Sequence, residues 1–98
     1  MTKIQTYIAI IQKGVTGFMK CEDYECMSMF LASLIIAAKT LRKEGIKEAA
    51  VAERNLEKLK IKVEKEKITL DNAKEKFEHV AKELALTAKE ALEHSNTA

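Results

Sequence analysis

The chain has 98 residues, the size of one small domain, and a hydrophobic content of 47% excludes a disordered tail. It has no proline and no tryptophan, and the net charge of +2 is too close to neutral to indicate a nucleic-acid or membrane partner. Proline removes a backbone donor and clashes inside a helix, so its absence favours helices. We therefore predict one all-α domain over residues 1–98 with an aliphatic core.

The first predicted helix covers residues 3–18. Its apolar side chains recur at steps of four and three residues, at Ile4, Ile8, Ile11, Val15 and Phe18. This spacing places them on one face of a helix. Gly14 and Gly17 interrupt the second half, and a glycine costs about 1 kcal/mol relative to alanine inside a helix. We expect the helix to end or loosen between residues 14 and 20.

Two cysteines, Cys21 and Cys26, follow this helix. Their spacing does not match a C-x-x-C redox motif, and two cysteines are too few for a disulfide framework. A helix that begins near Asp23 would point the two thiols in different directions. We therefore predict reduced thiols in a cytoplasmic protein.

The second predicted helix covers residues 24–44, between an N-cap at Asp23 and a terminating Gly45. Its main apolar stripe contains Met27, Phe30, Leu31, Leu34, Ala38 and Leu41. Further apolar residues extend most of the way round it, at Met29, Ile35, Ile36 and Ala37. The nearly apolar run over residues 26–38 is shorter than the roughly 20 residues that a membrane span needs. We predict a buried helix that is covered on at least two sides and no membrane span.

One heptad-spaced stripe continues through the rest of the chain, at Ala49, Ala52, Leu56, Leu59, Val63, Leu70, Ala73, Phe77, Val80, Leu84 and Ala91. Only Glu66 and Thr87 interrupt it, and no glycine or proline follows Gly45. The unbroken phase favours a single helix over residues 46–93, about 72 Å long. The chain would then be a helical hairpin or bundle of three helices with a long C-terminal helix. The alternative is a compact four-helix bundle with a break near residues 67–70 and Thr69 as N-cap.

The sequence shows no chemical site. A di-iron bundle needs Glu-x-x-His, and the residues three positions before His79 and His94 are Lys76 and Ala91. No glycine-rich phosphate loop is present, and neither cysteine has a histidine near it in the sequence. We predict no enzymatic activity, no catalytic residue, no cofactor and no metal.

The surplus of apolar surface favours a function in protein binding. The predicted interface residues are Met27, Met29, Phe30, Leu34, Ile61, Ile68, Leu70 and Phe77. Apolar helix faces of this kind dock a partner helix or groove. The protein would be an adaptor, a chaperone-like subunit or an inhibitor of a larger assembly.

Two other functions follow from other features. A structural homodimer would pair the long helices along a seam of Leu59, Val63, Leu70, Phe77 and Leu84. A nucleic-acid accessory factor would use Lys58, Lys60, Lys62, Lys65 and Lys67. These lysines alternate with glutamates and have no interleaved aromatic residue for base stacking, so nucleic acid is the disfavoured partner.

Overall fold

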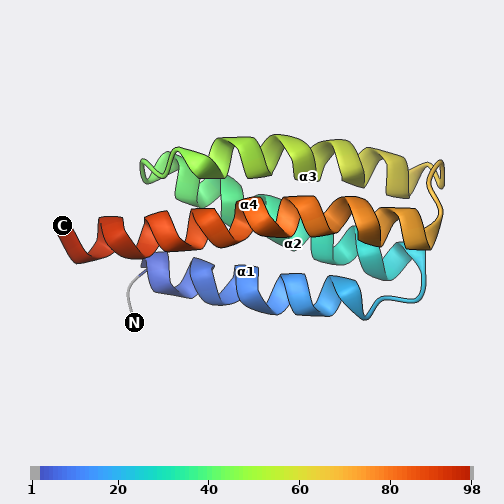
Figure 1. Ribbon diagram of the computed structural model, residues 1–98, viewed down its shortest axis with the longest axis horizontal. Helices are drawn as coiled ribbons and strands as arrows, with labels where there is room; N and C mark the ends of the chain where they lie inside the picture. The colour runs from blue at the N-terminus through green and yellow to red at the C-terminus, as the bar shows by residue number, and fades with distance from the viewer. Residues whose placement is uncertain (1–2, 98) are drawn as a thin grey trace.

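The computed structural model describes residues 3–97, and these residues form four α-helices. They are α1 (Lys3–Met19), α2 (Tyr24–Lys43), α3 (Glu48–Glu64) and α4 (Leu70–Thr97). Each helix packs against the next in the chain, and α4 also packs against α1, which closes an elongated bundle of 42 × 21 × 17 Å (Figure 1). The predicted all-α bundle is confirmed.

The preferred single helix over residues 46–93 is wrong, and the four-helix alternative is correct. The chain leaves α3 through Glu66, whose φ of 51° is left-handed. The backbone N–H of Lys67 donates to the Lys62 carbonyl at 3.0 Å, and that of Glu66 donates to the Val63 carbonyl at 3.1 Å. This is a Schellman ending, which usually has glycine at the left-handed position.

The next helix begins with local and tertiary hydrogen bonds. Thr69 Oγ1 accepts from the backbone N–H of Asn72 at 3.1 Å, as expected for an N-cap. The Tyr24 hydroxyl donates to the Ile68 carbonyl at 2.5 Å and so ties the connection to the start of α2. The heptad phase continues across the break because both helices bury the same stripe in one core, where every stripe residue except half-buried Leu70 is buried.

The left-handed Glu66 predicts a stabilising substitution. An L-residue in this conformation costs roughly 1–2 kcal/mol, and glycine removes the cost but loses part of the gain to unfolded-state entropy. We expect Glu66→Gly to raise the free energy of unfolding by about 0.5–1 kcal/mol, measured by urea denaturation. The matched control Glu75→Gly, at an exposed position inside α4, should lower it by about 1 kcal/mol. A loss of stability in Glu66→Gly would contradict the left-handed turn.

The first helix ends at Met19, within the range of residues 14–20 expected from the sequence, and both glycines lie inside it. A Cβ atom on Gly14 would lie 2.7 Å from Leu34 Cδ2, and one on Gly17 would lie 2.3 Å from Phe30 Cε1. Both glycines therefore allow close approach of α2. The close packing offsets their poor helix propensity.

The ends of α2 agree with the sequence prediction. The Asp23 carboxylate accepts from the backbone N–H of Cys26 at 2.7 Å. At the other end Gly45 has a φ of 97°, and the N–H of Ile46 donates to the Leu41 carbonyl at 3.1 Å. Ile46 and Leu41 are both buried, so the Schellman turn includes its usual apolar contact.

By length and composition alone, α2 is apolar enough to cross a membrane. A core helix of a helical bundle has the same character. In the bundle, α2 packs against α1 and α3 and buries Met27, Leu31, Leu34, Ala37, Ala38 and Leu41. The absence of a membrane span stays a prediction.

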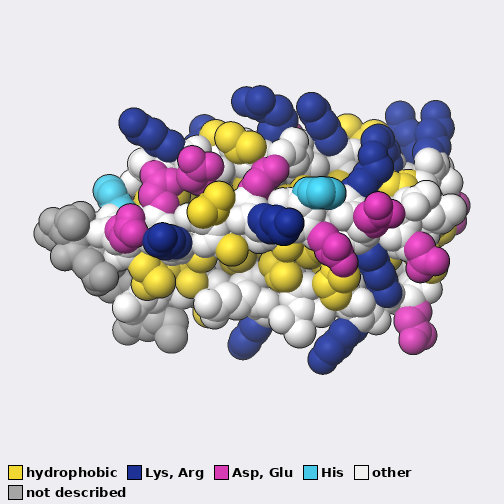
Figure 2. Space-filling view, in the orientation of Figure 1, with side chains coloured by type: hydrophobic (Ala, Val, Ile, Leu, Met, Phe, Trp, Pro, Cys, Tyr) yellow, Lys and Arg dark blue, Asp and Glu magenta, His cyan; other side chains and the backbone are white. Residues whose placement is uncertain are grey.

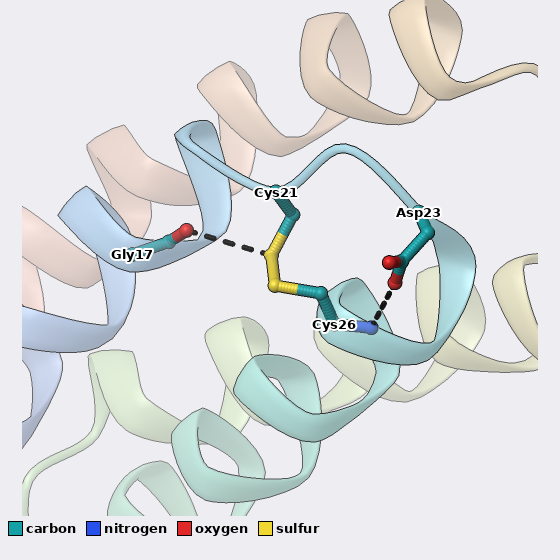
Figure 3. The surroundings of a disulfide bond; sticks show 4 residues. All are labelled: Gly17, Cys21, Asp23 and Cys26. Atoms are coloured by element: carbon teal, nitrogen blue, oxygen red, sulfur yellow. Dashed lines mark hydrogen bonds between the residues drawn. A yellow bond between two sulfur atoms is a disulfide. The ribbon is translucent and has the colours of Figure 1, made fainter.

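The prediction of two reduced thiols is wrong, because Cys21 and Cys26 form a disulfide (Figure 3). Their Cα atoms are 5.6 Å apart. Cys21 lies outside both helices, in a turn where its N–H donates to the Phe18 carbonyl at 3.1 Å. This turn brings Cys21 against the first turn of α2, so the two side chains are not constrained by one helix. The bond ties the end of α1 to the start of α2.

Candidate functional site

The structure divides the eight predicted interface residues into two groups. Met27, Leu34, Ile68 and Phe77 are buried in the core of the chain itself and are not accessible to a partner. Met27 and Leu34 were expected at an interface because the second helix is apolar on most sides, and Ile68 because it lies off the main stripe. Phe77 was expected there because one long helix would leave much of its stripe uncovered. The break after α3 folds α4 back onto that stripe and covers it.

The other four residues are at least partly accessible. Phe30 and Leu70 are half-buried against the core. Met29 and Ile61 are 68% and 54% exposed. Of the predicted dimer seam, only Leu70 is not buried, so the seam is the core of the chain itself and does not offer a face to a second copy.

A hollow of about 450 Å³ lies between α2 and α3. Its lining consists of Ala32, Ile35, Ile36, Glu57, Lys60, Ile61 and Glu64. Ile36 is 59% exposed and was not among the predicted interface residues. The sequence shows that α2 is apolar on most sides, but it does not show which side the other helices leave open.

A second hollow of about 290 Å³ continues between the same two helices toward the start of α2. Its lining consists of Tyr24, Glu25, Ser28, Met29, Val63, Glu64 and Glu66. Glu64 lines both hollows. We call the two together the α2–α3 groove. Its large exposed apolar side chains are Met29, Ile36 and Ile61.

Polar contacts lie in and beside this groove. Glu64 forms an ion pair with Lys60 on the same helix. The hydrogen bond from Lys60 lowers the pKa of Glu64, and a weaker one from Ser28 on α2 lowers it further. Along the same helix pair, Arg42 Nε donates to Glu53 Oε2 at 2.9 Å.

A groove between α1 and α4 is the other large hollow, about 510 Å³. Figure 2 shows apolar side chains along the boundary of these two helices. The lining of this α1–α4 groove consists of Ile11, Gln12, Val15, Thr16, Ala81, Ala85, Ala88, Lys89 and Leu92. Leu92 is the large hydrophobic residue of this lining that is well exposed, at 44%. The α2–α3 groove therefore offers more large apolar side chains to a partner.

The surface between α3 and α4 is basic. A hollow of about 260 Å³ there includes Lys58, Lys62, Lys76 and His79 in its lining. Lys76 lowers the pKa of Lys62 through a hydrogen bond and its charge, with smaller contributions from burial and Lys58. No phenylalanine, tyrosine or tryptophan belongs to this lining. The hollow offers charge to a polyanion but no ring on which a base would stack.

Among the described residues, no group of three or more His, Cys, Asp or Glu side chains is placed to hold a metal ion. The absence of enzymatic activity stays a prediction. No protein-family model, curated protein or solved structure matches this chain. The candidate site therefore rests on the chain's own geometry.

Proposed function

We propose that the protein is a small non-enzymatic protein-binding module, an adaptor, chaperone-like subunit or inhibitor of a larger assembly. The α2–α3 groove binds an amphipathic helix of the partner protein. The observation that supports this proposal is the exposure of Met29, Ile36 and Ile61 around one groove, at 68%, 59% and 54%. Single exposed apolar residues are normal, whereas a cluster beside a hollow is typical of an interaction site.

The dimensions of the groove suit a short helix. Met29 and Ile36 are two turns apart on α2, about 10 Å along its axis. A helix that lies along the groove presents anchors at the same spacing when its apolar residues recur at i, i+3 or i+4, and i+7. From Glu25 to Ile36 the groove extends over about 17 Å of α2, so it accommodates about three turns of a partner helix.

The test compares how well wild type and variants capture a partner protein and how tightly they bind it. Three tagged proteins are used to capture binding partners from an extract of the native host. They are the wild type, the groove variant Ile36→Ser/Ile61→Ser and the control Val51→Ser/Leu86→Ser. The control removes two apolar residues exposed elsewhere, at 41% and 54%. We expect one near-stoichiometric protein with wild type and control, and its loss with the groove variant.

The captured protein is then purified, and its affinity for each variant is measured by titration calorimetry. The groove substitutions remove exposed apolar surface that becomes buried on binding, so the dissociation constant should rise by roughly 10- to 100-fold. Circular dichroism should show equal helical content in all three proteins. Equal affinity of the groove variant and wild type would contradict the proposal. Recovery of the tagged chain alone with a doubled native mass would favour a homodimer.

A further inference from the structure

We infer that the helix bound in the α2–α3 groove is basic, with lysine or arginine on the flanks of its apolar stripe. This inference rests on the proposed function and adds the chemistry of the partner. The evidence is the charge of the residues that surround the exposed Met29, Ile36 and Ile61.

The rim of the groove is acidic. Its described lining contains four glutamates, Glu25, Glu57, Glu64 and Glu66, and one cation, Lys60. The excess of three negative charges is local, because the chain as a whole carries a net charge of +2. Composition therefore does not explain the acidity of this groove.

The glutamates differ in their availability to a partner. The pairing with Lys60 lowers the pKa of Glu64, so this carboxylate stays ionised at neutral pH, but its charge is largely compensated within α3. Glu25, Glu57 and Glu66 are exposed. Glu25 and Glu66 lie at one end of the groove, and Glu57 lies beside Ile61 nearer the other end. A helix with cations along both flanks meets carboxylates at both ends.

The same charges disfavour other occupants of the groove. A second copy bound through a two-fold axis would place one acidic rim against another, and like charges across an interface are repulsive. An anionic membrane surface would be repelled for the same reason. A basic amphipathic helix would cover the exposed apolar side chains and would also pair its cations with the excess carboxylates.

Three synthetic peptides test the inference with the full chain. Each has 14 residues and the same leucines at i, i+4, i+7 and i+11, and the flanking positions are lysine, glutamine or glutamate. Binding is measured by fluorescence anisotropy in low salt and in 0.5 M salt. We expect the lysine peptide to bind about tenfold more tightly than the glutamine peptide in low salt, with the glutamate peptide weakest. The advantage should shrink in high salt because the charges are exposed.

Matched variants assign this effect to the rim. Glu25→Gln/Glu57→Gln/Glu66→Gln should remove the advantage of the lysine peptide and leave the glutamine peptide unchanged. The control Glu75→Gln/Glu78→Gln/Glu93→Gln neutralises three exposed glutamates of α4 and should preserve the advantage. A loss of the advantage in both variants would overturn the inference, because the effect would come from overall charge.

The remaining outcomes separate this inference from the proposed function. Equal affinity for all three peptides, reduced by Ile36→Ser/Ile61→Ser, overturns the basic partner and leaves the helix-binding groove intact. Binding that Ile36→Ser/Ile61→Ser does not weaken overturns the groove as the site. Absence of binding by all three peptides, or a doubled native mass that the peptides do not alter, overturns both.

Discussion

Replacing Phe77 with alanine is expected to lower the free energy of unfolding by about 3–5 kcal/mol. Phe77 from α4 stacks on Phe18 from α1, with ring centroids 4.0 Å apart and an interplanar angle of 22°. Both side chains are fully buried. A domain of this size unfolds with about 5–15 kcal/mol, so the substitution removes a large fraction of its stability. Urea denaturation followed by circular dichroism measures the loss.

The exposed Leu86 of the same helix provides the control. Its side chain is 54% exposed, so Leu86→Ala should change stability by no more than about 0.5 kcal/mol. Phe18→Ala/Phe77→Ala should cost less than the sum of the two single substitutions, because the rings share one contact. Equal urea midpoints for Phe77→Ala and Leu86→Ala would place Phe77 at the surface. Its predicted role as an interface residue would then stand again.

Reduction of the Cys21–Cys26 bond is expected to lower the free energy of unfolding by about 2 kcal/mol. The bond closes a short loop, so it restricts the unfolded chain only moderately. For a domain of this size the loss corresponds to a fall of about 10 °C in the melting temperature. Thermal denaturation with and without dithiothreitol measures it, and Cys21→Ser/Cys26→Ser should melt at the reduced value in both conditions. If the protein is unfolded without reductant and two thiols can be titrated, the bond is absent.

The thiol state also bears on the location of the protein. Disulfides persist in oxidising compartments, and cytosolic thiols are usually kept reduced. The predicted cytoplasmic location stays a prediction, and the Cys21–Cys26 bond is the feature of the structure that argues against it. Alkylation of the thiols in intact cells before lysis reports their state in place.

Much of the secondary structure could be predicted from the sequence because its causes are local. Apolar spacing identified the buried face of each helix, and Asp23 and Gly45 were predicted as the residues that cap the two ends of α2. Thr69 was predicted as an N-cap only in the alternative with a break near residues 67–70, which is the one the structure shows. Each of these signals depends on neighbours within a few residues. The candidate site was predicted only in part. Met29 and Ile61 are exposed beside the α2–α3 groove, Ile36 was missed, and Met27 belongs to the core.

The features that sequence reasoning missed depend on contacts between distant segments. Glu90 of α4 accepts from the backbone N–H groups of Lys47 and Glu48, at 3.2 and 3.1 Å, and so caps α3 from 43 and 42 residues away. The side-chain amide of Asn55 donates to both carboxylate oxygens of Glu83, at 2.8 and 2.9 Å. Both contacts join α3 to α4, and they form only when the chain turns back after Glu64.

The sequence by itself determined that the chain is helical and which stripe of each helix is apolar, because periodicity acts over a few turns. Only the tertiary structure decided that Glu66 adopts the left-handed turn and that α4 covers the stripe of α3. The packing of the four helices also decided that Ile36 and Ile61 remain exposed to solvent. An apolar side chain becomes core or surface according to the number of helices that surround it, and that number depends on where the chain reverses.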